Sequence, residues 1–390
     1  MKSISELRAM REVYVAGIGI TKFGFYPDQE CYDFGSEATL NALKDADFEW
    51  KDIQAAFCGS VYQGVGIGHQ AIAEIGLTGI PIVNVENACS SGASAFRLAY
   101  QQVSTEIYDV VLAIGFEKMP RGLIASTAFR PWQAAMGWNV QPANYANQSM
   151  EYMEAYGATV EDFARVTVKN RRNAALNSNA RFQQEVTLDE VLNSRMIATP
   201  LRLLNCCPLA DGAAACILCS KEKLKSRNKA LTVAAAVLAS GVYGESFMMG
   251  GRGGGSIKFP PSIGIIELSA HQAYEISGYG PEDMDVVQAY DTMSPCELWD
   301  VEQLGFCKPG EAPRLLKEGA FDINGKTPVN TDGGLMGCGH PLGATSARQI
   351  YEVALQLRGE AGPRQVSGAK IALTHAEGAG PNSSVVILKR

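Results

Sequence analysis

One cysteine lies where a reactive thiol could form. Cys89 follows the strand-like run 81–85 and precedes the small residues 90–94, which are typical of a helix start. A sulfur there would lie among the unpaired N–H groups of a helix N-terminus. That setting favours the thiolate and can lower a cysteine pKa from about 8.5 to roughly 3.5–7.5. The alternative is a small buried cysteine without any chemistry.

One of the four histidines, His340, lies in the glycine-dense segment 329–348. Its glycines permit tight turns and the close approach of a ligand to the backbone. Pro341 disfavours helix at His340 and suits a helix start, so the imidazole should project from a strand-to-helix turn. A thiol with a positioned imidazole is a nucleophile–base pair. We therefore predict that Cys89 and His340 are catalytic.

A third glycine segment, 374–380, contains His375 and lies between two strand-like runs. A plain β-hairpin turn would also explain its glycines.

The residues around these positions resemble the motifs of the thiolase superfamily. The matching motifs are Asn87-x-Cys89-x-Ser91-Gly92 and Gly333-Gly334-x-x-x-x-Gly339-His340-Pro341-x-Gly343-Ala344-Thr345. Residues 204–215 resemble the sterol-carrier-protein-type thiolases in particular. The resemblance implies an α/β fold with two similar βαβαβαββ halves stacked in five αβαβα layers. We expect the first half at 1–116 plus 205–229, a lid-like insertion at 117–204, and the second half at 230–390.

The resemblance also implies catalytic roles. In that family the cysteine matching Cys89 is acylated, and the histidine matching His340 activates it. The cysteine that shuttles the α-proton is replaced here by His375, as in the sterol-carrier-protein type. Those relatives supply an acid/base cysteine from a His-Asp-Cys-Phe loop, but residues 290–293 of this chain read Tyr-Asp-Thr-Met. The acid/base candidates are His375, which its position favours, Cys338 and Cys296.

Binding residues follow from the same resemblance. The substrate oxyanion is expected to be held by the backbone N–H groups of Cys89 and of the Glu377–Gly378 turn, with Tyr290 and Met293 beside the substrate. Further contacts are expected from Cys207, which replaces a serine that touches coenzyme A, and from Pro208.

Two further segments of the sequence suggest phosphate contacts. The basic residues of 169–172, together with Arg181, either meet the coenzyme A phosphates or form a solvated helix face. The glycine-rich segment 248–256 lacks the ending of a nucleotide P-loop, and we expect a loop near the active site. We expect coenzyme A as a co-substrate, with no metal and no permanently bound cofactor.

Apolar runs alternate with helical patterns along the chain, which indicates an α/β architecture. The strand-like runs are 13–20, 55–59, 110–115, 231–237 and 286–289, and helical patterns cover 36–45 and 263–277. Cys216 and Cys219 have the spacing of a metal or redox site. Because they lie three apart in a predicted strand, their side chains should face opposite sides.

Composition narrows the class of protein. The chain has 390 residues, 46% hydrophobic and 19% charged, with a formal net charge of −7. This balance argues against nucleic acid or an anionic membrane as a partner, and no apolar run reaches the ~18 residues of a membrane span. Residues 1–8 lack an apolar signal core, and the last three are not a peroxisomal signal. We expect a cytoplasmic protein with free cysteines.

The resulting expectation is a thiolase that cleaves a 3-oxoacyl-CoA through a Cys89 acyl-enzyme, or runs the reverse Claisen condensation. The aromatic-rich insertion suggests a bulky aromatic or dicarboxylic substrate such as benzoylsuccinyl-CoA. By resemblance we expect a homodimer and a small OB-fold, zinc-ribbon partner subunit. The alternatives are an acyltransferase with a non-CoA carbon acceptor, a retro-aldolase, and a non-catalytic lipid-binding protein, although no fused sterol-carrier domain is expected.

Overall fold

The computed structural model describes residues 10–122, 129–241 and 264–390, and its first half is built on five strands. Their order in the sheet is β3-β2-β4-β7-β1. The strand β2 is parallel to β3 and β4, and β7 runs antiparallel between β4 and β1. The elements of this half are β1 (Val13–Ile20), α2 (Cys31–Ala46), β2 (Ala55–Gly59), α3 (Ile67–Ala73), β3 (Ile82–Val85), α4 (Ser91–Ser104), β4 (Val110–Glu117) and β7 (Gly212–Ser220).

The second half repeats this arrangement with the strand order β8-β11-β10-β9. A parallel bridge between Val287 and Val329 stands where the first half has its edge strand β3. The strand β8 also pairs with β1, which joins both halves into one nine-stranded sheet. The elements are β8 (Leu231–Ser240), α9 (Ile265–Ser277), β9 (Val286–Gln288), α10 (Ser294–Gln303), α11 (Ala312–Lys317), α12 (Gly334–Cys338), α13 (Leu342–Arg358), β10 (Ile371–Gly378) and β11 (Asn382–Lys389).

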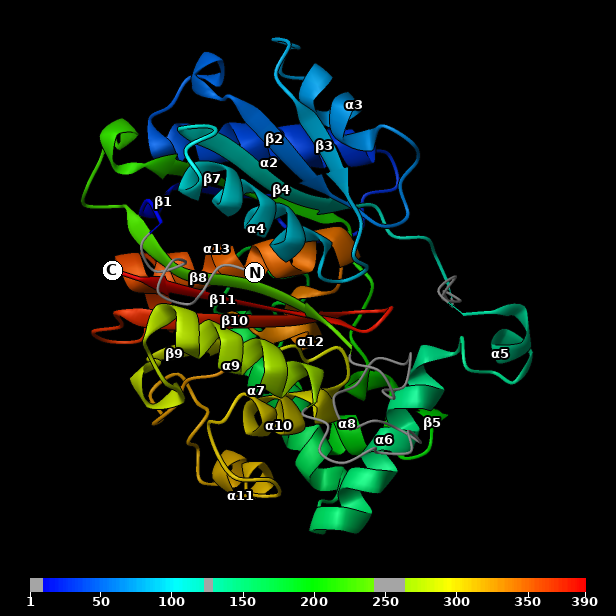
Figure 1. Ribbon diagram of the computed structural model, residues 1–390. Helices are drawn as coiled ribbons and strands as arrows, with labels where there is room; N and C mark the ends of the chain where they lie inside the picture. The colour runs from blue at the N-terminus through cyan, green and yellow to red at the C-terminus, as the bar shows by residue number, and fades with distance from the viewer. Residues whose placement is uncertain (1–9, 123–128, 242–263) are drawn as a thin grey trace.

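Helices and sheet portions alternate in five layers (Figure 1). The helices α4 and α13 lie between the two sheet portions, α2 and α3 cover the outside of the first, and α9 and α10 cover the outside of the second. Each interface has its own apolar cluster, marked by Phe34 in the first outer layer, Phe96 in the middle and Ile266 in the second outer layer. The predicted α/β class with five layers is confirmed.

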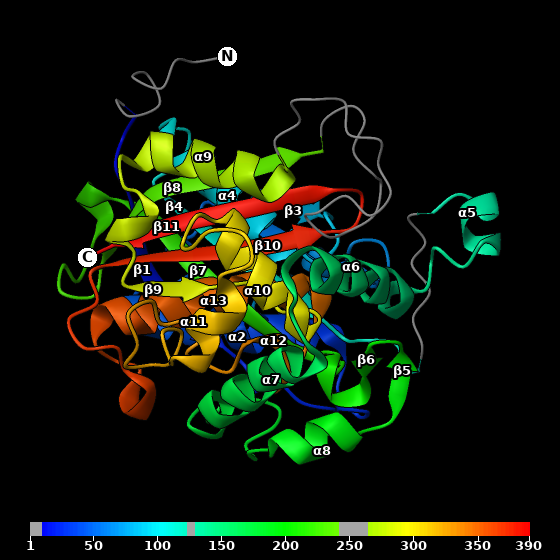
Figure 2. The same ribbon diagram turned by 90° about the horizontal axis from the view of Figure 1, so that it is seen from below.

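The segment between β4 and β7 inserts additional elements along one side of the molecule (Figures 1 and 2). The helix α7 packs against α10 and α12 of the second half. The proposed domain boundaries and the lid role stay predictions. The inserted elements are α5 (Pro131–Ala135), α6 (Gln141–Tyr156), α7 (Val160–Ala175), α8 (Leu188–Asn193), β5 (Met196–Ala198) and β6 (Leu201–Arg202).

The C-terminal hairpin differs in detail from the expectation for segment 374–380. The strand β10 continues to Gly378, which pairs with Asn382 of β11, so His375 and Glu377 lie inside a strand. The prediction for the cysteine pair is confirmed, because Cys216 packs in the middle layer and Cys219 in the outer one. Segment 248–256 lies outside the described residues. Within the described ranges, no helix is both long enough and apolar enough to cross a bilayer.

Candidate active site

Cys89 lies in a tight turn just before α4. Ala88 has a φ of 48°, in the left-handed region that non-glycine residues rarely adopt. The turn is closed by the Ser90 N–H, which donates to the Asn87 carbonyl at 3.1 Å, and by the Asn87 N–H, which donates to Ser91 Oγ at 2.9 Å. Backbone in a sparsely populated conformation is often found at functional sites, where surrounding contacts maintain it.

Close backbone contacts fix the Cys89 turn relative to the His340 turn. A methyl group on Gly378 would lie 2.2 Å from the Asn87 carbonyl oxygen, and one on Gly115 would lie 2.3 Å from the Gly343 carbonyl oxygen. Only glycine permits these approaches. The carboxylate of Glu117 also accepts a hydrogen bond from the Gly343 N–H at 3.0 Å, which holds the start of α13.

The hydrogen bonds of His340 determine which ring nitrogen carries its proton. Nδ1 lies 2.7 Å from Thr345 Oγ1, and that hydroxyl donates its single hydrogen to the Pro341 carbonyl at 2.9 Å. Thr345 can therefore only accept from Nδ1–H. This leaves a lone pair on Nε2, which is the nitrogen that a general base needs.

Tyr290 connects the histidine to the cysteine. Its hydroxyl lies 3.2 Å from His340 Nε2 and also hydrogen-bonds the Cys89 side chain, which lowers the pKa of that thiol. The backbone N–H of Tyr290 donates to Asp300 Oδ2 at 2.8 Å, which fixes the loop. Cys89, Tyr290 and His340 thus form a continuous chain along which a proton can move.

The expected low pKa of Cys89 was wrong. The residue is only 6% exposed, and burial together with the charges of Glu117 and Glu377 outweighs the Tyr290 hydrogen bond and raises the pKa of Cys89 to about 12. Burial and the nearby charge of Arg348 lower the pKa of His340 to about 3. The site therefore holds a neutral thiol and a neutral imidazole.

This charge state predicts how Cys89 reacts with iodoacetamide. With a pKa near 12, the thiolate fraction rises roughly tenfold per pH unit over the whole range from about pH 7 to 9. We expect the alkylation rate to follow that rise without a plateau, measured by peptide mass spectrometry. Cys89→Ala identifies the signal of the other cysteines. A plateau near neutral pH would show that the thiolate already exists before substrate binds.

The predicted binding strip lies beside the Tyr290 loop. The Cys207 N–H donates to the Thr292 carbonyl at 3.0 Å, and the Pro208 carbonyl accepts from the His340 N–H at 2.8 Å. Met293 is buried in the same apolar cluster as Cys89. The structure thus brings these predicted residues together, while the oxyanion roles of Cys89 and the Glu377–Gly378 turn stay predictions.

The three acid/base candidates have different surroundings. His375 is fully buried, with Nδ1 at 2.8 Å from Asp300 Oδ2 and Nε2 at 2.9 Å from Ser383 Oγ. Burial lowers its pKa, but the attraction to Asp300 outweighs burial, and the net shift is upward. Cys338 Sγ lies 3.3 Å from the Asp332 carbonyl, in a separate cluster. Cys296 packs in the cluster that contains Cys89.

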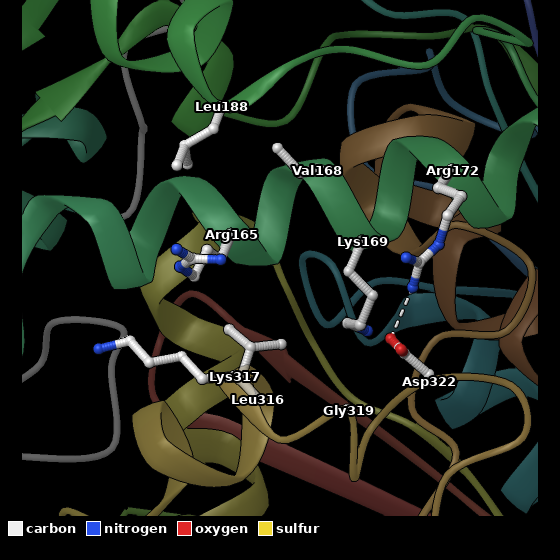
Figure 3. Close-up of a pocket in the computed structure, with 9 residues that line it drawn as sticks. All are labelled: Arg165, Val168, Lys169, Arg172, Leu188, Leu316, Lys317, Gly319 and Asp322. Carbon is white, nitrogen blue, oxygen red and sulfur yellow. Dashed lines mark hydrogen bonds and ion pairs between the residues drawn. The ribbon is translucent and has the colours of Figure 1, made fainter.

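Of the three basic residues of 169–172, only Arg172 is exposed to solvent. Lys169 is 3% exposed and lies 3.0 Å from the Glu297 carboxylate, and Arg171 is buried over the ring of Phe182. Lys169 and Arg172, with Arg165 and Val168 of the same helix α7, line a pocket of about 200 Å³ against α8 and α11 (Figure 3). Its other basic residues are each paired with an acid: Arg165 with Glu161, Arg172 with Asp322, and Lys317 with Asp162.

Sequence reasoning did not single out three residues of this site. Thr345 was part of the motif, but its role depends on a hydrogen-bond geometry that only the fold shows. Glu117 ends β4 without a local signal. Tyr145 of α6 is buried in the same apolar cluster as Cys89, but in the sequence it is one of many aromatic residues of the insertion. Within the described ranges, no group of three or more histidine, cysteine or acidic residues could hold a metal ion.

Comparison with known proteins decides the family. Residues 13–222 match the model of the N-terminal thiolase domain, and residues 263–390 match a thiolase C-terminal domain-like model. The chain belongs to the thiolase family. It is an enzyme of the acyltransferase type within that family.

Several members of the thiolase family are similar over almost their whole length. An acetyl-CoA acetyltransferase of Methanothermobacter thermautotrophicus is 39% identical over 393 residues, covering 98% of this chain and 100% of that protein. The benzoylsuccinyl-CoA thiolase subunit BbsB of Thauera aromatica is 37% identical, covering 96% of each. Human sterol carrier protein 2 is 36% identical, covering 98% of this chain and 73% of that protein.

Solved structures support the same fold. The structure of an Ltp2-ChsH2(DUF35) aldolase superposes with a TM-score of 0.83 at 28% identity, covering 97% of this chain and 98% of that chain. Human mitochondrial 3-ketoacyl-CoA thiolase in complex with CoA gives 0.71 at 17% identity over 97% of this chain and 98% of that one, which shows the fold alone.

Proposed function

We propose that this protein is a thiolase that cleaves a 3-oxoacyl-CoA with coenzyme A, or forms one by the reverse Claisen condensation. The observation that carries the proposal is the Cys89–Tyr290–His340 chain, because it joins a thiol to an imidazole whose free lone pair can accept the proton. A merely structural cysteine would need neither the chain nor the strained turn at Ala88.

The first half-reaction forms the acyl-enzyme. Cys89 passes its proton through the Tyr290 hydroxyl, which gives its own proton to His340 Nε2, and the sulfur adds to the 3-oxo carbon of the substrate. The carbon–carbon bond then breaks, leaving an acyl group on Cys89 and an acetyl-CoA carbanion. That carbanion takes up a proton from the acid/base residue, for which His375, Cys338 and Cys296 stay the candidates, and acetyl-CoA leaves. Of the three, Cys338 lies in a different apolar cluster from Cys89.

The second half-reaction regenerates the thiol. Coenzyme A gives its thiol proton to the acid/base residue that protonated the carbanion, which restores that residue, and the coenzyme A sulfur attacks the acyl group on Cys89. Acyl-CoA forms, and Cys89 leaves as a thiolate that recovers a proton from His340 through Tyr290. The Cys207–Pro208 strip is the proposed contact for the coenzyme A arm. Backbone hydrogen bonds join Pro208 to His340 and Cys207 to the loop that contains Tyr290, so the strip lies beside the reacting groups.

The proposal predicts a covalent adduct on one residue. Intact-mass spectrometry after brief incubation with a panel of 3-oxoacyl-CoAs, without free coenzyme A, should show acylation of the parent protein and none of Cys89→Ala. The added mass identifies the acyl group, and later coenzyme A should remove it. A protein that iodoacetamide alkylates at Cys89, but that no 3-oxoacyl-CoA acylates even when purified as its native complex, would contradict the proposal.

Substrate and assembly form the finer part of the proposal. The similarity to BbsB and the aromatic insertion support a bulky aromatic or dicarboxylic acyl group such as benzoylsuccinyl. The similar aldolase structure, whose name pairs Ltp2 with a DUF35 protein, and the subunit name of BbsB support a small OB-fold, zinc-ribbon partner. The exposed Val83 on the edge strand β3 supports a homodimer. Ten free cysteines support the cytoplasm as the location.

Two other reactions are distinguishable from thiolysis. An acyltransferase with a non-CoA carbon acceptor would form the adduct on Cys89 but would not release it to coenzyme A. The similarity to an aldolase structure supports a retro-aldolase as the second candidate, and such a reaction would survive Cys89→Ala because it needs no acyl-enzyme.

A further inference from the structure

Tyr145 extends from α6 of the insertion into the apolar cluster that contains Cys89. Its side chain is only 2% exposed and packs in the same cluster as Tyr290, Met293 and Cys296. It thus links the insertion to the residues that form the proposed acyl-enzyme.

The hydroxyl of Tyr145 is buried without a hydrogen-bond partner in the described part of the chain. The other two buried tyrosines in the described part of the chain have partners: Tyr152 Oη donates to Glu302 Oε1 at 2.6 Å, and Tyr290 Oη lies 3.2 Å from His340 Nε2. An unpaired buried hydroxyl is costly, and its presence in a folded protein calls for an explanation. A phenylalanine would fill the same space without that cost.

Two cysteines, Cys89 and Cys296, lie in the same apolar cluster as Tyr145. Burial is the largest cause that raises the pKa of Tyr145, and negative charge on Cys296, Glu377, Cys89 or Cys207 would raise it further. These residues come from α10, β10, the turn before α4 and the proposed coenzyme A strip. Because its pKa lies well above the ordinary value, the phenol keeps its proton and is a hydrogen-bond donor at any working pH.

We propose that the Tyr145 hydroxyl donates a hydrogen bond to the acyl carbonyl oxygen of a bound 3-oxoacyl thioester, at the carbon that Cys89 attacks. This rests on the proposed function. When the sulfur adds, that oxygen becomes negatively charged, and a donor already in place in a buried site stabilises the charge. Tyr145 is thereby a catalytic residue contributed by the insertion, beside the backbone N–H groups predicted for the same oxygen.

The test compares Tyr145→Phe with Tyr152→Phe, a matched change two turns later on the same helix. In single-turnover acylation by a 3-oxoacyl-CoA, Tyr145→Phe should be about 10²–10³-fold slower than the parent, the usual loss for one oxyanion donor. Its iodoacetamide alkylation rate at Cys89 should be unchanged, because the hydroxyl acts on the substrate. Its melting temperature should be equal or higher, whereas Tyr152→Phe should melt lower and acylate normally.

The possible outcomes distinguish failure of the proposed role of Tyr145 from failure of the proposed thiolase function. Equal acylation rates for the parent and Tyr145→Phe would overturn the role of Tyr145 and leave the thiolase function intact. A lower melting temperature for Tyr145→Phe, with a proportional loss of alkylation, would show a structural hydroxyl and also overturn it. If the parent itself is alkylated but never acylated, the proposed function fails and the role of Tyr145 fails with it.

Discussion

In the Tyr290→Phe variant, acylation of Cys89 by a 3-oxoacyl-CoA should be about 10²–10⁴-fold slower than in the parent protein, the range that one proton-transfer group contributes. The phenylalanine keeps the ring but removes the hydroxyl that contacts both Cys89 and His340 Nε2. Since that hydrogen bond lowers the pKa of Cys89, its loss should raise the pKa further. Alkylation by iodoacetamide at about pH 9 should slow as well, in contrast to Tyr145→Phe.

A double variant tests whether the three residues act as one chain. If the proton reaches His340 only through Tyr290, then Tyr290→Phe with His340→Ala should be no slower than the slower single variant, because groups that act as a unit are not additive. Multiplicative losses would contradict the chain and would mean that His340 reaches the thiol directly. The acylation rate from rapid-quench mass spectrometry is the measurement for all four proteins.

The local part of this site could be predicted from the sequence. The rule that a residue before proline avoids helix placed His340 in a turn ahead of a helix, and α13 does begin at Leu342. The small residues after Cys89 likewise predicted the start of α4, at Ser91. These features depend on backbone geometry within a few residues, so the sequence contains the information they need.

The electrostatic part could not be predicted in this way. The low pKa expected for Cys89 considered only the helix N-terminus, whereas burial depends on β10, α10 and the insertion, which are distant in the chain. The surroundings of His375 depend in the same way on Asp300 and Ser383, which only the fold brings to its ring. Sequence motifs locate reactive groups, but the charge state of those groups depends on burial and on contacts with residues that are distant in the chain.

Lys169 shows the same limit most clearly, because its sequence context suggests a phosphate contact or a solvated residue. Its ammonium group donates to the Val329 carbonyl at 2.8 Å and lies 3.0 Å from Glu297. Asn170 donates to Glu297 and also to Asp291. Asp291 in turn accepts from the Leu335 N–H at 2.8 Å, in the helix that precedes His340. The buried charges thus connect α7 to the loops of Tyr290 and His340.

Lys169→Met should therefore destabilise the protein by about 3–5 kcal/mol, because it leaves the buried Glu297 carboxylate without its cation. Arg172→Met, on the same helix, removes an exposed pair with Asp322 and should cost no more than about 1 kcal/mol. Urea denaturation at a fixed protein concentration measures both. Equal losses would contradict the buried-pair interpretation, and Lys169→Met with Glu297→Gln should recover part of the stability.

The stability lost in Lys169→Met should be smaller at low pH than at high pH. Burial and the charge of Glu297 raise the pKa of Asp291 to about 7, so the folded state binds this proton more tightly than the unfolded chain. The contribution of Asp291 to stability is therefore greatest at low pH and is lost as the pH rises towards 7. Without the Lys169 cation, the neighbouring carboxyl groups of Asp291 and Glu297 repel each other more strongly when both are ionised. The deficit of Lys169→Met should thus be smaller at about pH 5 than at about pH 8, and an equal deficit at both would mean that packing rather than charge holds this helix in place.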